Sequence, residues 1–279
     1  MRLVCGRPVT CGADSAAVLA EPYHWPMTPT AILSALKEEQ QGLLELLQNP
    51  QRVTRAGRDF WRGQLHGQPV VLALSRVGKV AAATTATTLI EHFGVGRIVF
   101  TGVAGGIAAG VDVGDIVIAS SFVQHDLDAS PLFPRYQVPL YGRSVFDCDS
   151  SILTMLNIAT HALLTGATGQ FNGVFTKKSI KIHQGLVASG DRFVCGTAES
   201  LVIQAALHSA GFQPLAFEME GAAVAQVCFD YSVPFAAVRV ISDRADDAAH
   251  IDFQKFVTEV ASHYSVAIID GFMKLEIQQ

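Results

Sequence analysis

The chain has 279 residues, of which 49% are hydrophobic and 16% charged, and its formal net charge at pH 7 is −5. This composition supports a sizeable apolar core, and the acidic balance argues against nucleic-acid binding, which normally requires a basic surface. No apolar run reaches the roughly 18–20 residues of a membrane-spanning helix. The five cysteines are widely spaced without a C-x-x-C pair, which favours free thiols in a reducing, cytoplasmic compartment.

The chain divides into a short extension and one domain. Residues 1–26 have the composition of a loop and lack the apolar segment of a signal peptide, so we expect a poorly ordered extension. Residues 27–279 alternate between short apolar runs and segments with helical spacing. In chain order, strands are expected at 31–33, 69–74, 97–101, 115–120 (with an extended segment at 122–128), within 173–188 and at 234–241, and helices at 36–47, 80–92, 150–164, 197–210, 218–231 and 252–275.

The order of these elements indicates the fold class. Strands that alternate with helices and are continuously apolar are typical of a largely parallel sheet covered on both faces. No repeat, low-complexity tract or linker interrupts residues 27–279, which predicts a single α/β domain. The loop at 130–149 is long and rich in Pro, Tyr and Arg, so we expect it to be functional or to contact a partner.

A glycine-rich segment, TGVAGGIAAG at 101–110, follows a predicted strand. Glycines at such a position let the backbone approach a ligand closely. The G-x-x-G-G-x-x-x-G spacing, without an acidic residue about 20 positions later, argues against dinucleotide binding. A tight turn that lines another ligand is favoured, and a plain turn remains the alternative.

Acidic residues stand at costly places in this apolar chain. Glu218 and Glu220 begin a small-residue helical run, and Asp243 ends an apolar strand, where ligands bind in open α/β sheets. A buried carboxylate costs several kcal/mol unless it is paired or protonated, so such positions suggest acid–base chemistry. The plain alternatives are a solvated charge at a helix start for Glu39 or Glu220, and a cap or turn for Asp243. The histidines show no metal-ligand spacing, so no metal is assigned.

Several segments together resemble a known family. FEMEGAAVAQVC followed by VPFAAVRVISD is similar to the signature of the 5′-methylthioadenosine/S-adenosylhomocysteine nucleosidases, within the nucleoside phosphorylase/hydrolase superfamily. Further blocks resemble that family in the same order from about residue 30 onward, namely SRVGKVAAA, TGVAGG, VGDIVIAS, HDLD, SGDRFV and HIDF. The resemblance implies a single-domain, three-layer α/β/α sandwich with a central mixed, mostly parallel sheet. It also implies a homodimer, no cofactor, and hydrolysis of the N-glycosidic bond of an adenine thionucleoside.

The resemblance also implies site residues. Asp243 matches the acid that protonates the adenine, and Glu39 the base that activates water. Glu220 resembles the carboxylate that binds the ribose hydroxyls, and Met219 packs under the sugar. The other matched positions are Phe193, Val194 and Phe253 around the adenine and pocket wall, Arg239 and Ser242 as supports of the carboxylates, Leu36, Val77 and Gly78 near the ribose and 5′ group, and Ala104 and Gly105 of the glycine-rich segment.

Two positions bear on the nucleophile. Phosphorylases of the superfamily commonly carry an Arg just before the glycine segment, where this chain has Phe100, and Val103 stands where many nucleosidases have Ser. Both favour water over phosphate. Arg76 in SRVGK stands where nucleosidases often carry Gly and could recruit an anion, although a surface Arg that points away is the favoured interpretation.

Three functions remain open at this point. The first is hydrolysis of 5′-methylthioadenosine and S-adenosylhomocysteine. The second is a phosphorylase, or a nucleosidase for another modified adenosine, and the third is a non-catalytic nucleoside-binding protein. In the implied homodimer, the 131–141 loop, with Leu132 or Phe133, is expected to complete the partner's 5′ pocket.

Overall fold

The computed structural model describes residues 27–165, 180–257, 260 and 262–276. The strands are β1 (Thr30–Ser34), β2 (Gln48–Arg55), β3 (Arg58–Leu65), β4 (Gln68–Leu74), β5 (Arg97–Gly106), β6 (Ile116–Gln124), β7 (Val145–Asp147), β8 (Ile182–Ser189), β9 (Ala216–Glu218) and β10 (Phe235–Asp243). The helices are α1 (Lys37–Leu46), α2 (Lys79–Phe93), α3 (Ser150–Thr165), α4 (Thr197–Ser209), α5 (Gly221–Tyr231), α6 (Ala249–Phe256) and α7 (Ser262–Glu276).

The strands form one mixed sheet. Its centre is parallel, with β1 between β4 and β5, and with β10 on the other side of β5. β10 also pairs antiparallel with β6, β6 and β8 are parallel, β8 and β9 are parallel, and β9 returns antiparallel to β5. These pairings close a ring, β5–β10–β6–β8–β9, so that the ends of β5, β9 and β10 lie together on one side of the sheet.

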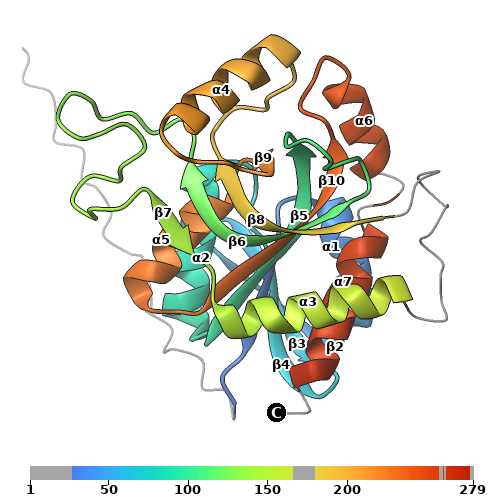
Figure 1. The fold of residues 1–279 in the computed structure, drawn as a ribbon. Helices are drawn as coiled ribbons and strands as arrows, with labels where there is room; N and C mark the ends of the chain where they lie inside the picture. The colour runs from blue at the N-terminus through green and yellow to red at the C-terminus, as the bar shows by residue number, and fades with distance from the viewer. Residues whose placement is uncertain (1–26, 166–179, 258–259, 261, 277–279) are drawn as a thin grey trace, which may run out of the picture.

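Helices cover both faces of the sheet, as Figure 1 shows. α2 and α5 pack against each other on one face, and α1, α3 and α7 form the layer on the other face. The strands between these layers are almost entirely buried, as in β10, where all nine residues are buried. The predicted three-layer α/β class is confirmed. In the described residues, no helix combines the length and the apolar character that crossing a bilayer requires.

Several elements differ from the sequence-based expectation. β5 continues as a strand through the glycines to Gly106 rather than turning at Thr101, because those residues pair with β10 and β9. The β2–β3 hairpin was not expected, since β2 is exposed along nearly its whole length and shows no apolar run. The C-terminal helix is two helices, α6 and α7, and the helix expected from Glu218 starts at Gly221, because β9 takes residues 216–218.

Some expectations fall outside the described residues. They are the extension at 1–26 and the first part of the 173–188 region, in which one or two strands were expected. In the described part, Cys148, Cys195 and Cys228 are free thiols, as expected.

Candidate active site

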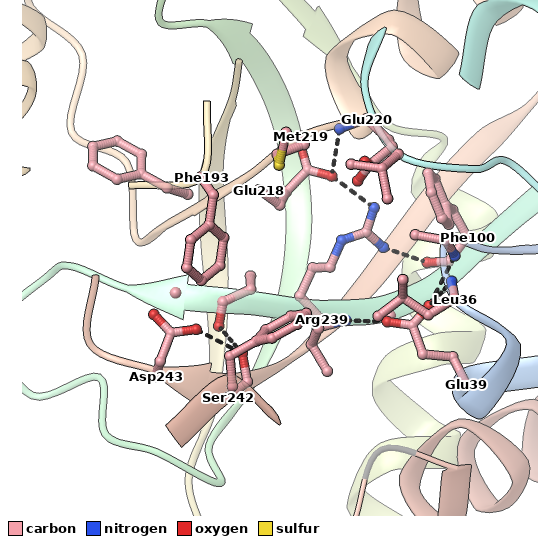
Figure 2. A pocket seen from close by; sticks show the side chains of 18 residues that line it. Leu36, Glu39, Phe100, Phe193, Glu218, Met219, Glu220, Arg239, Ser242 and Asp243 are labelled. Atoms are coloured by element: carbon pink, nitrogen blue, oxygen red, sulfur yellow. Dashed lines mark hydrogen bonds and ion pairs between the residues drawn. The ribbon is translucent and has the colours of Figure 1, made fainter. Parts of the chain in front are cut away.

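A cavity of about 330 Å³ opens where β5, β9 and β10 end (Figure 2). Most of the predicted site residues line it, although they come from distant parts of the chain. They are Leu36, Glu39, Val77, Ala104, Gly105, Phe193, Met219, Glu220, Arg239, Ser242, Asp243 and Phe253. Val194 lines a small adjoining cavity instead, together with Phe193 and Asp243, and Gly78 contacts the site through its backbone.

The glycines of β5 make room for the acids of the site. A Cβ atom at Gly105 would lie 2.7 Å from Oδ1 of Asp243, and one at Gly102 would lie 3.1 Å from Oε1 of Glu39. Contacts of 2.7 Å are too short for a real Cβ, so Asp243 can occupy its position only beside a glycine. The glycine-rich segment is therefore neither a dinucleotide loop nor a plain turn, but the strand against which both carboxylates lie.

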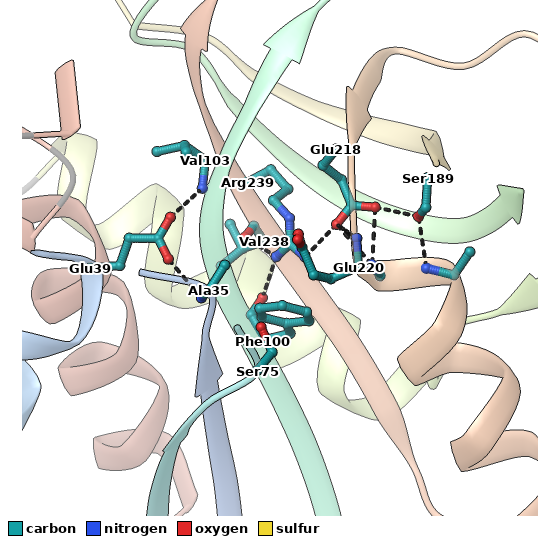
Figure 3. Close-up of polar contacts among 12 residues, drawn as sticks. Ala35, Glu39, Ser75, Phe100, Val103, Ser189, Glu218, Glu220, Val238 and Arg239 are labelled. Carbon is teal, nitrogen blue, oxygen red and sulfur yellow. Dashed lines mark hydrogen bonds and ion pairs between the residues drawn. The ribbon is translucent and has the colours of Figure 1, made fainter. Parts of the chain in front are cut away.

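Glu39 is a buried carboxylate held by backbone amides. It occupies the first turn of α1 and accepts hydrogen bonds from the N–H groups of Ala35 (2.8 Å), Leu36 (2.9 Å) and Val103 (3.1 Å), shown in part in Figure 3. The first two amides begin the helix, so the side chain caps its own helix. Burial raises the pKa of Glu39, and the three amides and the charge of Arg239 oppose that rise. Glu39 is thus a buried, hydrogen-bonded carboxyl group and not a solvated surface charge.

Asp243 ends β10 at an irregularity of the strand. The β5–β10 register shifts between Ile241 and Asp243, which inserts Ser242 as an extra residue, and such bulges re-aim side chains. Oδ2 of Asp243 accepts from Oγ of Ser242 at 2.8 Å, and Oδ1 accepts from the N–H of Ala245 at 2.8 Å. The carboxyl group is therefore fixed at the edge of the cavity, next to Gly105 and Phe193.

Glu220 is the third buried acid that lines the cavity. It is the N-cap residue of α5, and its Oε1 accepts from the N–H of Gly78 at 2.8 Å. Burial raises its pKa to about 8, and the negative charge of Glu218 adds to the rise. Glu39, Glu220 and Asp243 are only 1%, 6% and 2% exposed, so each is costly unless it does chemistry or binds a ligand.

A buried ion pair supports the floor of the cavity (Figure 3). Nη2 of Arg239 lies 2.9 Å from Oε2 of Glu218, and Nη1 donates to the carbonyl of Phe100 at 3.0 Å. The guanidinium also lies over the Phe100 ring, 4.1 Å from its centroid. Glu218 in turn accepts from the hydroxyl of Ser189 and from the N–H of Gly221 at 2.8 Å, at the start of α5. Arg239 and Glu218 each have further hydrogen bonds besides their ion pair, which makes the pair a rigid support of the cavity.

Aromatic and apolar groups form the remaining wall. The rings of Phe193 and Phe253 meet edge to face, with centroids 5.3 Å apart. Phe193 is 41% exposed and Val77 is 53% exposed, so both present apolar surface at the cavity without being buried by the protein itself. An aromatic ring that stays open beside buried acids suits a flat, apolar ligand such as a purine.

A sequence model of the phosphorylase superfamily matches residues 29–274. The chain belongs to the phosphorylase superfamily. It is 32% identical over 238 residues to the 5′-methylthioadenosine/S-adenosylhomocysteine nucleosidase of Shewanella sediminis, which covers 85% of this chain and 96% of the relative. Within the superfamily it therefore belongs with these nucleosidases, and the resemblance noted in the sequence is confirmed.

Solved structures of the superfamily are similar throughout the chain. The Neisseria meningitidis nucleosidase in complex with methylthio-immucillin-A is 31% identical with a TM-score of 0.78, over 89% of this chain and 100% of that one. The native futalosine hydrolase of Helicobacter pylori is 29% identical with a TM-score of 0.76, over 89% and 98%. The same fold thus carries related hydrolases.

For this superfamily member, sequence reasoning missed part of the cavity lining. Ala35, Gly102 and Phe217 were not singled out, whereas Phe100, Val103 and Glu218 were noted for other reasons and not as lining residues. Glu218 was noticed as a carboxylate, but its role as partner of Arg239 was not assigned. The signal was the E-x-E spacing in FEMEG, which in an extended segment sends both side chains to the same face.

Proposed function

We propose that this protein hydrolyses the N-glycosidic bond of 5′-methylthioadenosine and S-adenosylhomocysteine, releasing adenine and the thioribose product. The observation that carries the proposal is one cavity of about 330 Å³ that three buried acids line, Glu39, Glu220 and Asp243, with an open aromatic ring at one end. The nucleosidases that share this fold support the assignment of substrate.

The proposed mechanism divides the work between the acids. Adenine leaves poorly as an anion, so Asp243, beside Phe193, donates a proton to the ring as the bond breaks. The sugar becomes cationic, as in glycoside hydrolysis, and Glu39 takes a proton from the attacking water. Glu220 holds the ribose hydroxyls, since a carboxyl group with a raised pKa can both donate and accept hydrogen bonds. Arg239 acts through Glu218 and positions the α5 end that carries Glu220.

Water is favoured over phosphate as the nucleophile. A phosphate dianion needs cationic side chains or free amides around it. Among the residues that line the cavity, the basic side chain is Arg239, and its guanidinium is engaged by Glu218 and the Phe100 carbonyl. The N–H of Val103 is also occupied, because it donates to Glu39. A phosphate there would meet the Glu39 carboxylate instead of a donor.

The test is adenine release from a panel of 5′-substituted adenosines, with and without inorganic phosphate. We expect release from 5′-methylthioadenosine at the same rate in both conditions, with the free thioribose as co-product. A rate that requires phosphate, with a sugar phosphate as product, would show a phosphorylase. Binding of the panel without release of adenine would show a nucleoside-binding protein.

A nucleosidase for another modified adenosine is the second candidate. The structural similarity to the futalosine hydrolase of Helicobacter pylori favours including this class. An adenosine derivative with a larger 5′ substituent belongs in the same panel, and a higher kcat/KM for it than for 5′-methylthioadenosine would support the second candidate.

We also propose a cytoplasmic homodimer that acts in methionine salvage. The 131–141 loop exposes Leu132 and Leu140, at 84% and 93%, and such open apolar side chains suit a protein interface. Phe229 and Tyr231 of the nearby α5 end are also exposed, and Tyr141 contacts Phe229. Size-exclusion chromatography with light scattering would measure the mass in solution. A monomer mass would contradict the proposed dimer.

A further inference from the structure

A second cavity, of about 700 Å³, lies beside the first and plays no part in the proposed chemistry. Ala35, Leu36 and Val77 line both cavities. The second one extends from these residues to the β2–β3 hairpin and the first turn of α1. It is about twice as large as the first, so the two together exceed what a methylthio nucleoside would fill.

Two arginines face this second cavity. Arg58 begins β3, directly after the hairpin turn, and Arg76 precedes α2. Arg76 donates to the carbonyl of Gly57 in the turn, and Arg58 donates to the carbonyls of Ala56 at 3.0 Å and Ala81 at 3.4 Å. These hydrogen bonds hold both guanidinium groups beside the hairpin turn, although their positive charges repel each other. The burial of Arg58 lowers its pKa, and the positive charge of Arg76 lowers it further.

Neither arginine is matched by a carboxylate. Within the described ranges, no acidic oxygen lies within 4.0 Å of either guanidinium, unlike Arg52, Arg97 and Arg239, which have such partners. Two acids do line the cavity, Glu38 and Asp59, along with Lys37. Asp59 is already bound by Thr54 at 2.6 Å and by Arg52 at 3.7 Å, so it leaves Arg58 and Arg76 uncompensated.

Arg76 also stands in an unusual backbone conformation. Its φ is +63°, in the left-handed region that glycine adopts without strain. Such a conformation is strained in a non-glycine residue and is often found at functional sites. The long cationic side chain is therefore held at this position despite the strain that a glycine would avoid.

We propose that the second cavity binds the anionic end of a long 5′ substituent, with Arg58 and Arg76 as the residues that recognise a carboxylate. The inference rests on the proposed function. With the purine at Phe193 and Asp243, the sugar's 5′ side faces Leu36 and Val77, and a long substituent continues past them. A methylthio group ends before the cavity, whereas a chain that ends in a carboxylate reaches the two guanidinium groups. An amino-acid tail adds an ammonium group, for which the cavity offers the exposed acid Glu38.

The test compares two isosteric substrates. One is a 5′-thioadenosine with a carboxylate at the end of a three-carbon S-alkyl chain, and the other carries the carboxamide in its place. We expect kcat/KM for the carboxylate to be about tenfold higher in the wild type, as expected for hydrogen bonds to charged groups. Arg58→Gln and Arg76→Gly are each expected to bring that ratio close to one.

The matched control is Arg55→Gln. Arg55 lies on the same hairpin and binds His92 and the carbonyl of Thr54, outside the cavity. It should keep the wild-type ratio, which separates a local contact from the general field of the protein. A ratio near one in the wild type, or a ratio that Arg58→Gln and Arg76→Gly both leave unchanged, would overturn the inference.

Inorganic phosphate distinguishes a substrate tail from a free anion. Competition by phosphate against the carboxylate substrate, with little effect on the carboxamide, supports the tail. Acceleration of both substrates by phosphate would instead assign the arginines to a free anion and overturn the inference. Release of adenine from 5′-methylthioadenosine without any carboxylate preference leaves the proposed function in place. If no compound releases adenine, the same ratio is measured as dissociation constants by calorimetry.

Discussion

At the scale of single residues, the site depends on acids that a solvated surface would not hold. Glu39, Glu220 and Asp243 are each buried, and each has one to three hydrogen-bond donors in the protein. Donors of this kind fix the direction of a carboxyl group, and burial adjusts how readily it holds a proton. The arrangement therefore fixes the position of the three acids before a substrate arrives, and burial raises the pKa of Glu39 and Glu220.

Replacing Asp243 by Asn should remove the proton donor while keeping the shape of the site. Asn retains an oxygen for the N–H of Ala245 or the hydroxyl of Ser242, so the fold should persist. We expect kcat for adenine release to fall by roughly 10²–10⁴-fold. Binding of a non-cleavable substrate analogue, measured by calorimetry, should change far less. Near-wild-type turnover would remove Asp243 from the chemistry.

The raised pKa of Glu220 predicts how stability depends on pH. Its pKa is about 8 in the folded protein, against about 4.3 for an ordinary Glu. Between these values the folded protein keeps a proton that the unfolded chain releases. The contribution of Glu220 to stability is therefore complete below about pH 4 and is lost as the pH rises toward 8.

Glu220→Gln tests this directly, because Gln stays neutral at every pH. The variant is expected to lose less stability than the wild type between pH 5 and pH 8, so the difference in Tm between them should shift steadily in favour of Gln. Thermal melts of both proteins across that range measure it. The same replacement at the exposed Glu38 serves as control and should leave the pH profile of the wild type unaltered. A difference in Tm that is constant with pH would contradict the raised pKa.

At the scale of elements, β5 and β10 build the site together. Their parallel register sets Gly102 opposite Arg239 and Gly105 opposite Asp243. Glycines inside a strand weaken it, because they contribute no packing and lose more entropy on folding. Here the glycines leave space for Asp243 of β10 and Glu39 of α1. The weaker strand is the cost of fitting both carboxylates beside it.

Gly105→Ala is the matching test. The new Cβ would lie 2.7 Å from Oδ1 of Asp243 and 3.3 Å from the Cβ of Ala245, so the carboxyl group must move. A displacement of about 1 Å is expected to cost on the order of 10²-fold in kcat. Gly196→Ala is the control, because its Cβ would have only Oδ1 of Asp247 nearby, at 3.8 Å. Equal activities of the two variants would show that Gly105 does not set the position of Asp243.

The elements also show what the sequence can predict. β4, α2 and β10 follow from long apolar runs or clear helical spacing, and the structure has them within one or two residues of the expected bounds. β2 does not follow, because QNPQRVTR is polar and its pairing with β3 depends on backbone hydrogen bonds. β9 has three residues, too few for a period to be recognised.

The site was predictable to a different degree. Residue types and positions marked Asp243 and Glu220 as costly acids, but their shared cavity with Glu39 followed only from the resemblance to a family. Nothing in the local sequence separates Glu218, which pairs with Arg239, from Glu220, which lines the cavity without a cation. That distinction arises from the strand β9 and the cap of α5, which are tertiary features.

At the scale of the whole molecule, the two ends of the parallel strands have different surroundings. The active-site cavity lies where the parallel strands β1, β5 and β10 end. The other ends of these strands hold the start of β1, where Thr30 pairs with Arg97, the first residue of β5. Pro29 is held there by a hydrogen bond from the N–H of Gly96 at 3.0 Å. The described chain therefore begins at the strand ends opposite the catalytic acids.

This placement predicts that a chain starting at Met27 folds and works like the complete one. Removing residues 1–26 leaves every strand of the sheet and every residue of the cavity in place. We expect the free energy of unfolding to change by no more than roughly 0.5 kcal/mol, as for changes away from the core, with kcat/KM for adenine release unchanged. Denaturant unfolding and a turnover assay on both chains measure this. A clear loss of either quantity would show that the extension packs against the domain, which would then begin before residue 27.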